Sequence, residues 1–378
     1  MRLRVKPAMT GVKPAMTSEC AYLYVRKIFI RGNMLDNNAS VLLLYTGGTI
    51  GMTEDVETGA LKPFDFQSLK SYVPELSRLL FRIDSRSFEE PIDSSDMNPA
   101  RWKQIARIIE LNYEQYDGFV ILHGTDTMAY TASALSFMLE NLNKPVILTG
   151  SQLPIGKIRT DGKENLITAL EIAVDKDEDG NAFVPEVCIF FQNVLMRGNR
   201  TTKISADNFK AFNSFDFPYL AEAGTFIRYQ HQLVHKPAAG SVPKFHYYLD
   251  PNLTILKLFP GISADTLKAI FSIPHLKGVV LETYGAGNSP DEEWFLEIIR
   301  SAIEKGIVVV NVTQCAFGRV AMGRYQSGKK LEDMGVISGY DITTEAAITK
   351  LMFLFGHDYP HSKVAQMMAQ SIAGEVSL

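Results

Sequence analysis

The sequence predicts an α/β protein of two domains, each built around a parallel β-sheet. Apolar segments of strand length alternate with helix-length segments over most of the 378 residues, enough chain for two cores. The pattern weakens once, over residues 229–250, and then resumes. We therefore expect a larger amino-terminal domain of the Rossmann or flavodoxin-like type at 37–228, a linker at 229–250 and a smaller carboxyl-terminal α/β domain at 251–378.

The first 36 residues differ from the rest of the chain. The hexapeptide VKPAMT occurs twice, at Val5–Thr10 and Val12–Thr17, and neither copy has helical or strand periodicity. We interpret residues 1–36 as a disordered tail or as upstream translation, with Met34 as a candidate natural start.

The first predicted strand begins at Val41 and runs into the turn TGGTIGM, which ends at Met52. Gly47 and Gly48 permit positive φ angles or a close approach to a ligand, and open α/β sheets bind ligands at the carboxyl ends of their strands. Thr49 is therefore the first candidate for a reacting group. A tight turn without chemistry fits the same stretch equally well.

Two further predicted strands also end in small polar turns. Gly118–Thr127 places Thr125 and Asp126 directly after a strand and at the start of a helix that begins at Thr127. The strand Pro145–Thr149 is followed by the turn Gly-Ser-Gln. Such turns share one rim of a parallel sheet, where free N–H groups favour a small polar or anionic substrate.

The segments beside these strands carry weaker signals. Thr53–Phe66 is a long loop that suits either a lid or a plain connection. Pro99–Tyr116 has the pattern of an amphipathic helix. Ser94–Asp96 fits a helix cap better than a substrate-binding turn, although Ser94 remains a candidate for holding a substrate.

The run RGNRTTK, Arg197–Lys203, follows a predicted buried strand at Glu186–Phe191. Three cations within seven residues usually form a solvated turn. Alternatively, burial or a neighbouring cation lowers the pKa of Lys203 enough for proton transfer. The remaining predicted elements are a helix at Asn165–Val174, strands at Leu253–Leu258, Gly278–Thr283 and Gly306–Val312, and helices at Ala264–Phe271 and Asp291–Glu304.

The composition argues against several classes of function. A net charge of −4 is unlike that of a nucleic-acid-binding protein, and no apolar run has the length of a membrane-spanning helix or of a signal-peptide core. The cysteines Cys20, Cys188 and Cys315 are odd in number and lack C-x-x-C spacing, which indicates a reducing, cytoplasmic compartment.

The motifs of common cofactor and metal enzymes are also missing. The GGTIG turn is not G-x-G-x-x-G, the seven histidines show no metal-binding pattern, and G-x-S-x-G does not occur. These observations argue against dinucleotide binding, a histidine metal site and a serine–histidine hydrolase. Threonine, aspartate and lysine remain, and this set suits acyl transfer from a small amide, with a lysine beside Thr125, Asp126 orienting it and turn N–H groups binding an oxyanion.

TGGTIG at 46–51 together with HGTDT at 123–127 resembles the pair of signatures of the bacterial-type L-asparaginases. The longer matches LYTGGTIGM, DSSDM, GSQLP, RGNRTTK, PGISAD and VVVNVTQC resemble the cytoplasmic, type I branch, and the similarity runs from about Val41 to the carboxyl terminus. The resemblance implies hydrolysis of L-asparagine to L-aspartate and ammonia through an acyl-enzyme ester, without a metal or organic cofactor.

The resemblance also implies roles for particular residues. Thr49 is the expected nucleophile, while Thr125, Asp126 and Lys203 form a second triad. Ser94, with Ser95 beside it, is expected to hold the substrate α-carboxylate, and Asp126 the α-ammonium. Asn288 matches a residue contributed by a neighbouring protomer, so a homodimer or homotetramer with a site near the interface is expected.

Two positions depart from the family pattern. Where many members have a lid tyrosine, this chain has Gly59–Pro63, so activation falls to Lys203 and Thr125 or to a tyrosine such as Tyr72. Glu282 replaces an arginine of a regulatory asparagine site, and its carboxylate would repel that ligand's carboxylate.

Two other functions fit the fold less well: an amino-acid-binding protein without turnover, and the asparaginase-like subunit of a tRNA amidotransferase. The sequence also leaves open the preference for asparagine over glutamine, because one methylene group changes binding by only ~1–3 kcal/mol.

Overall fold

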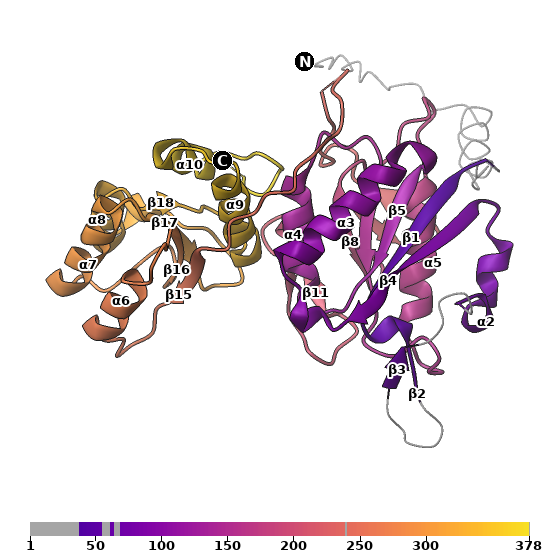
Figure 1. Ribbon diagram of the computed structural model, residues 1–378, viewed down its shortest axis with the longest axis horizontal. Helices are drawn as coiled ribbons and strands as arrows, with labels where there is room; N and C mark the ends of the chain where they lie inside the picture. The colour runs from indigo at the N-terminus through magenta and orange to yellow at the C-terminus, as the bar shows by residue number, and fades with distance from the viewer. Residues whose placement is uncertain (1–37, 55–60, 64–68, 239, 378) are drawn as a thin grey trace, which may run out of the picture.

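The computed structural model describes residues 38–54, 61–63, 69–238 and 240–377, which form two lobes, each with its own sheet (Figure 1). The amino-terminal sheet has eight strands. Their spatial order is β13 (Ile227–Tyr229), β12 (Ala221–Ala223), β9 (Val194–Arg197), β8 (Val187–Phe191), β7 (Val146–Thr149), β5 (Gly118–Leu122), β1 (Ser40–Gly47) and β4 (Arg82–Ile92).

The predicted parallel sheet is confirmed for β8, β7, β5, β1 and β4, which all run in the same direction. The other three strands extend the sheet in antiparallel fashion, which the sequence pattern did not predict. All four parallel strands with buried, strand-length apolar runs were recognised in the sequence. The edge strand β4 was not, because Phe88 is its only buried residue and its other side chains are largely polar.

The strand β1 is apolar along its length because both faces of the sheet are covered. Leu42 and Leu44 pack into the core beneath α3 (Pro99–Asn112) and α4 (Met128–Met138). Val41 and Leu43 point the other way, into the core beneath α5 (Gly162–Val174) and the short helix α2 (Leu69–Tyr72).

The predicted carboxyl-terminal βα series is confirmed as a second, smaller parallel sheet. Its order is β15 (Leu253–Lys257), β16 (Gly278–Thr283), β17 (Val308–Thr313) and β18 (Ile337–Ser338). One face packs on α6 (Ala264–Phe271), α7 (Glu293–Glu304) and α8 (Gln326–Asp333). The other packs on α9 (Thr344–Gly356) and α10 (His361–Met368).

The helix α4 joins the two lobes. Its residue Phe137 packs in the core of the carboxyl-terminal lobe, with its ring 6.2 Å from that of Phe353 on α9. The two helices are neighbours in Figure 1, where α9 lies on the side of its lobe that faces α4. The joint is therefore apolar and continuous with the second core.

Short strand pairs modify three expected segments. They are β2 (Met52–Glu54) with β3 (Leu61–Pro63), β10 (Thr202–Lys203) with β11 (Phe212–Asn213), and β6 (Leu139–Glu140) with β14 (Lys244–Phe245). The expected loop at 53–66 thus contains a hairpin, and its residues 55–60 and 64–66 lie outside the described residues. The helix from Thr127 ends sooner than predicted, because the pairing of β6 with β14 takes over at Leu139.

In the part of the chain that the structure describes, no helix is long and apolar enough to cross a membrane. Residues 230–252 connect the two sheets. The exact domain limits, including the linker at 229–250, remain predictions.

Candidate active site

The turn after β1 is shaped by two glycines. Gly47 and Gly48 have φ angles of +134° and +91°, which residues with a side chain rarely adopt. A 3₁₀ turn, Thr49–Gly51, follows directly. The Tyr45 hydroxyl donates a hydrogen bond to the Gly51 carbonyl at 3.1 Å, which ties this turn to the buried end of the strand. Thr49 is half-buried at the start of the turn.

Three polar turns meet at Gly124, the second residue after β5. A Cβ atom added at Gly48 would lie 2.5 Å from the Gly124 Cα, and one added at Gly124 would lie 2.5 Å from the Ser94 Oγ. Both contacts are closer than real Cβ atoms allow, so the Gly48 and Gly124 backbones touch and the Ser94 side chain packs directly on Gly124. Thr49 and Thr125 each follow a glycine of this contact, and the structure therefore brings the two threonine turns together.

Lys203 completes the second set of predicted residues. Its Nζ donates to the Thr125 Oγ1 at 2.9 Å and lies 2.5 Å from the Asp126 Oδ1. The lysine side chain is 19% exposed and the aspartate 64%, so the lysine is enclosed while the carboxylate faces solvent. The Thr125 hydroxyl lies 3.5 Å from the Gln152 Oε1, a partner that the sequence did not single out. The expected Thr125, Asp126 and Lys203 group is thus assembled.

The arrangement can move a proton. With both Nζ contacts in place Lys203 is the donor, and its charge is balanced by Asp126. Once the amine is neutral, the same short Nζ to Oγ1 contact lets it accept the Thr125 proton, which makes that hydroxyl, or a water bound to it, a better nucleophile.

Ser94 packs beside the Thr125 turn and does not cap α3. The cap is Asn98, whose Oδ1 accepts hydrogen bonds from the backbone N–H groups of Ala100 and Arg101. Ser94 is buried against Gly124, and its carbonyl accepts the Thr127 hydroxyl at 2.6 Å. The preference for a capping role was therefore wrong. Ser95 is exposed, and its N–H binds the Asp93 carboxylate.

The basic run before Lys203 is buried, which contradicts the expectation of a solvated turn. Arg197 pairs with Glu186 at 2.6 Å and Arg200 with Asp341 at 3.1 Å, so both charges are neutralised. The Nε of Arg200 also donates to the Gly374 carbonyl of the carboxyl-terminal segment. Lys203 is thus presented by a turn that ion pairs and the end of the chain hold in place.

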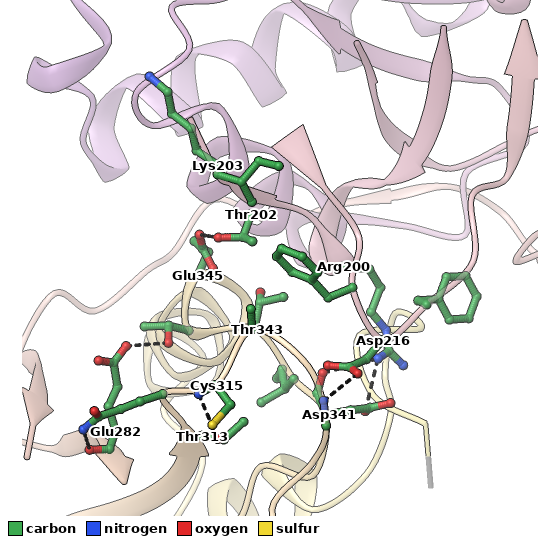
Figure 2. A pocket seen from close by; sticks show the side chains of 18 of the residues that line it. Arg200, Thr202, Lys203, Asp216, Glu282, Thr313, Cys315, Asp341, Thr343 and Glu345 are labelled. Carbon is green, nitrogen blue, oxygen red and sulfur yellow. Dashed lines mark hydrogen bonds and ion pairs between the residues drawn. The ribbon is translucent and has the colours of Figure 1, made fainter. Parts of the chain in front are cut away.

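A cavity of about 520 Å³ lies between the lobes behind Lys203. Figure 2 shows Thr202 pointing into it, toward Glu345, while Lys203 extends the opposite way, as neighbouring residues of a strand do. The Thr202 hydroxyl donates to the Glu345 carboxylate at 2.5 Å, and burial raises the pKa of Glu345. Sequence reasoning missed this glutamate, which no motif marks.

Glu282 lines the same cavity and is paired there. Its carboxylate accepts the Thr344 hydroxyl at 2.7 Å and lies 3.3 Å from the Lys257 Nζ. The consequence of this residue for regulation remains a prediction.

Asn288 lies apart from this group within one chain. It closes the turn after β16 by a bridge to Tyr284, and its Oδ1 is 3.5 Å from the Ser327 hydroxyl. Within the described residues no hydrogen bond links it to Thr125, Asp126 or Lys203. Its contribution from a second protomer remains a prediction.

The source of a lid tyrosine also remains a prediction. Gly59 and Ala60 lie outside the described residues, and Leu61–Pro63 form β3. Tyr72 packs beside Gly156, in the loop that follows the third strand end. The part of Tyr72 in activating Thr49 remains a prediction.

Two family models match the chain: the Asparaginase, N-terminal model over residues 40–235 and the Glutaminase/Asparaginase C-terminal domain model over residues 252–368. The chain belongs to the asparaginase family. This is a family of amidohydrolases, and the resemblance and the α/β fold predicted from the sequence are both confirmed.

Individual relatives agree with this assignment. L-asparaginase 1 of Escherichia coli K12 is 43% identical over 89% of this asparaginase chain and 98% of its own length. The crystal structure of L-asparaginase I from Vibrio cholerae is 41% identical, with a TM-score of 0.81 over 90% of this chain and all of that one. The mouse 60 kDa lysophospholipase is 42% identical over 89% of this chain but only 62% of its own length.

Proposed function

We propose that this asparaginase hydrolyses L-asparagine to L-aspartate and ammonia, with Thr49 as the nucleophile. The observation that carries the proposal is the contact of two threonine turns at Gly48 and Gly124, with Lys203 bound to the second threonine at 2.9 Å. The first turn supplies the Thr49 hydroxyl, and Lys203, which is bound to Thr125 of the second turn, supplies a base. Nucleophilic acyl transfer requires both groups.

In the first half of the proposed reaction, the Thr49 Oγ attacks the side-chain amide carbon of asparagine. The hydroxyl proton passes through the site to the amide nitrogen, which leaves as ammonia, and an ester joins Thr49 to the aspartyl group. The negative oxygen of the tetrahedral intermediate binds to backbone N–H groups of the glycine turns, and each such donor typically contributes ~3–4 kcal/mol.

In the second half, water attacks the ester carbon. Neutral Lys203 takes a proton through the Thr125 hydroxyl, and Asp126 holds the lysine in place through its short contact with Nζ. Cleavage of the ester returns the proton to Thr49 and releases aspartate. No residue outside the described site is needed for the balance of protons.

The substrate is recognised by its charged α-groups. The exposed Asp126 carboxylate is proposed to bind the α-ammonium, and Ser94, with Ser95 beside it, to bind the α-carboxylate. Asn288 of a second copy is proposed to complete the pocket, so the active form is a homodimer or homotetramer. Because Cys188 and Cys315 are unpaired thiols, a cytoplasmic location is part of the same proposal.

The test is ammonia release from purified protein with L-asparagine and with L-glutamine, using Thr49→Ala and Lys203→Met as variants. We expect turnover of asparagine in the wild type and a loss of about 100-fold or more in both variants, in line with removal of a nucleophile or a proton-transfer group. Lys268→Met, an exposed lysine on α6, is the matched control and should keep full activity.

The same protein is assayed with a lysophospholipid. Fatty-acid release without ammonia release would refute the asparaginase proposal in favour of a lipid hydrolase. A Thr49→Ala variant with undiminished ammonia release would instead remove Thr49 from its role.

A further inference from the structure

Beneath the Thr125 turn lies a buried chain of hydrogen bonds that the proposed mechanism does not use. The Trp102 Nε1–H donates to the Thr131 Oγ1 at 2.9 Å, and the same oxygen lies 2.9 Å from the His123 Nε2. The His123 Nδ1 lies 2.7 Å from the Gly124 carbonyl oxygen. The three side chains are at most 5% exposed. The chain of contacts therefore runs from α3 through α4 to the catalytic turn.

The chemistry of the two ends determines the direction of every bond. A carbonyl oxygen only accepts, so the proton must sit on the His123 Nδ1. An indole only donates, so the Thr131 oxygen accepts from Trp102. In a neutral imidazole with its proton on Nδ1, the Nε2 can only accept, so the Thr131 hydroxyl donates to it. Every group of the chain therefore has a partner when the imidazole is neutral. Burial agrees with this, because it lowers the pKa of His123 to about 4.

The Gly124 carbonyl oxygen, which His123 contacts, belongs to the residue at which the three turns meet. Gly124 is the residue against which the Gly48 turn and the Ser94 side chain pack. A trans peptide unit is planar, with its C=O and N–H pointing in opposite directions. Holding the Gly124 carbonyl toward the buried ring therefore turns the Thr125 N–H away from the core.

We infer that His123 is a positioning residue for the proposed amide hydrolysis: its Nδ1–H fixes the Gly124 peptide and thereby aims Thr125 and sets the spacing of the Thr49 and Thr125 turns. The inference rests on the proposed function. It assigns a task to a histidine that neither binds a metal nor exchanges a proton with the substrate, and it treats Trp102 and Thr131 as the supports that keep the ring in one tautomer.

Two amide substitutions separate this task from simple packing. In His123→Asn the side-chain NH₂ takes the place of Nδ1 and can still donate to the Gly124 carbonyl, but the contact with Thr131 is lost. In His123→Gln the amide reaches the place of Nε2 and can still contact Thr131, but the donor to Gly124 is lost. Asn is smaller than Gln by one methylene group, so a role in packing alone predicts the greater loss in His123→Asn.

We expect His123→Gln to lower kcat about tenfold or more with little change in KM, because small displacements of catalytic groups are costly. His123→Asn should keep kcat within about threefold of the wild type, although it leaves the larger cavity and should lose more thermal stability. Equal kcat values in the two variants, or a greater loss in His123→Asn, would overturn the inference.

A second measurement does not depend on turnover. Hydrogen exchange at the Thr125 and Asp126 amides should be faster in His123→Gln than in His123→Asn, and equal exchange would again refute the positioning role. If the wild type releases no ammonia, the proposed function fails on its own, while the exchange comparison still decides whether His123 orders this turn.

Discussion

At the scale of single residues, the site contains two nitrogen groups with different surroundings. Lys203 is enclosed but has an exposed carboxylate beside it, so its charge is paired at the edge of the site. His123 is fully enclosed with neutral neighbours, so it is held in one uncharged form.

The buried His123 predicts a specific loss of stability in acid. Its pKa is lowered to about 4 in the folded protein from 6.5, so the unfolded chain binds the proton first. The full stability is present above pH 6.5 and is lost as the pH falls toward 4, by up to about 3 kcal/mol. Urea unfolding of wild type and His123→Gln over this range should show a shallower pH dependence in the variant. Parallel curves would contradict the shift.

At the scale of elements, the glycine turn after β1 depends on two separate requirements. Gly48 needs a positive φ angle, and it also needs space, because Gly124 lies where a Cβ atom would be. Gly180, in an exposed loop, needs only the first, since its φ is +80° and no atom lies within 4 Å of an added Cβ. Alanine variants at the two positions therefore separate the cost of backbone strain, which both share, from disruption of the contact with Gly124, which only the Gly48 variant causes.

Gly48→Ala is therefore expected to reduce asparagine hydrolysis by about 100-fold or more, because it forces the two threonine turns apart. Gly180→Ala should cost about 1–2 kcal/mol of unfolding free energy through strain and leave kcat unchanged. Chemical unfolding and ammonia release on both variants test this. A fully active Gly48→Ala enzyme would mean that the contact at Gly124 is not required.

At the scale of the whole molecule, the carboxyl-terminal segment joins the lobes. Carbonyl groups of Ala373 and Gly374 accept hydrogen bonds from Asn199 and Arg200, in the turn that leads to Lys203. Behind them the Lys350 Nζ and Glu375 Oε1 form an ion pair of 2.6 Å in which both side chains are 0% exposed. Residues 373–375 therefore hold the turn that leads to Lys203 from the side of the second lobe.

Removal of one charge of that pair should strongly lower the free energy of unfolding. Glu375→Ala leaves Lys350 charged in the core and is expected to cost about 3–5 kcal/mol, as for other buried pairs that lose one partner. Glu332→Ala, in a half-exposed ion pair with Lys329, should cost far less, because water solvates both charges with or without the pair. Urea unfolding of both variants tests the difference. The double variant Lys350→Met/Glu375→Leu should recover part of the loss, and equal effects of the two single variants would show that the pair is not buried in solution.

The sequence alone predicted the parallel strands, the order of the βα units and the strand-end positions of the candidate catalytic residues, whose roles remain predictions. Apolar runs such as Val41–Leu44 are unambiguous because both faces of the strand are buried, and Thr49, Thr125 and Asp126 stand directly at strand ends. The local sequence pattern was sufficient for these features because each depends on residues that are close together in the chain.

Only the tertiary structure decided which distant groups meet. Asp126 and Lys203 are 77 positions apart in sequence but lie 2.5 Å apart in the fold. The ion pairs of the buried Arg197 and Arg200 likewise use partners that no local pattern marks. Ser94 likewise changed from an expected cap to a buried neighbour of Gly124. Such contacts depend on how the lobes and turns pack, and packing brings together residues whose separation in the chain carries no periodic signal.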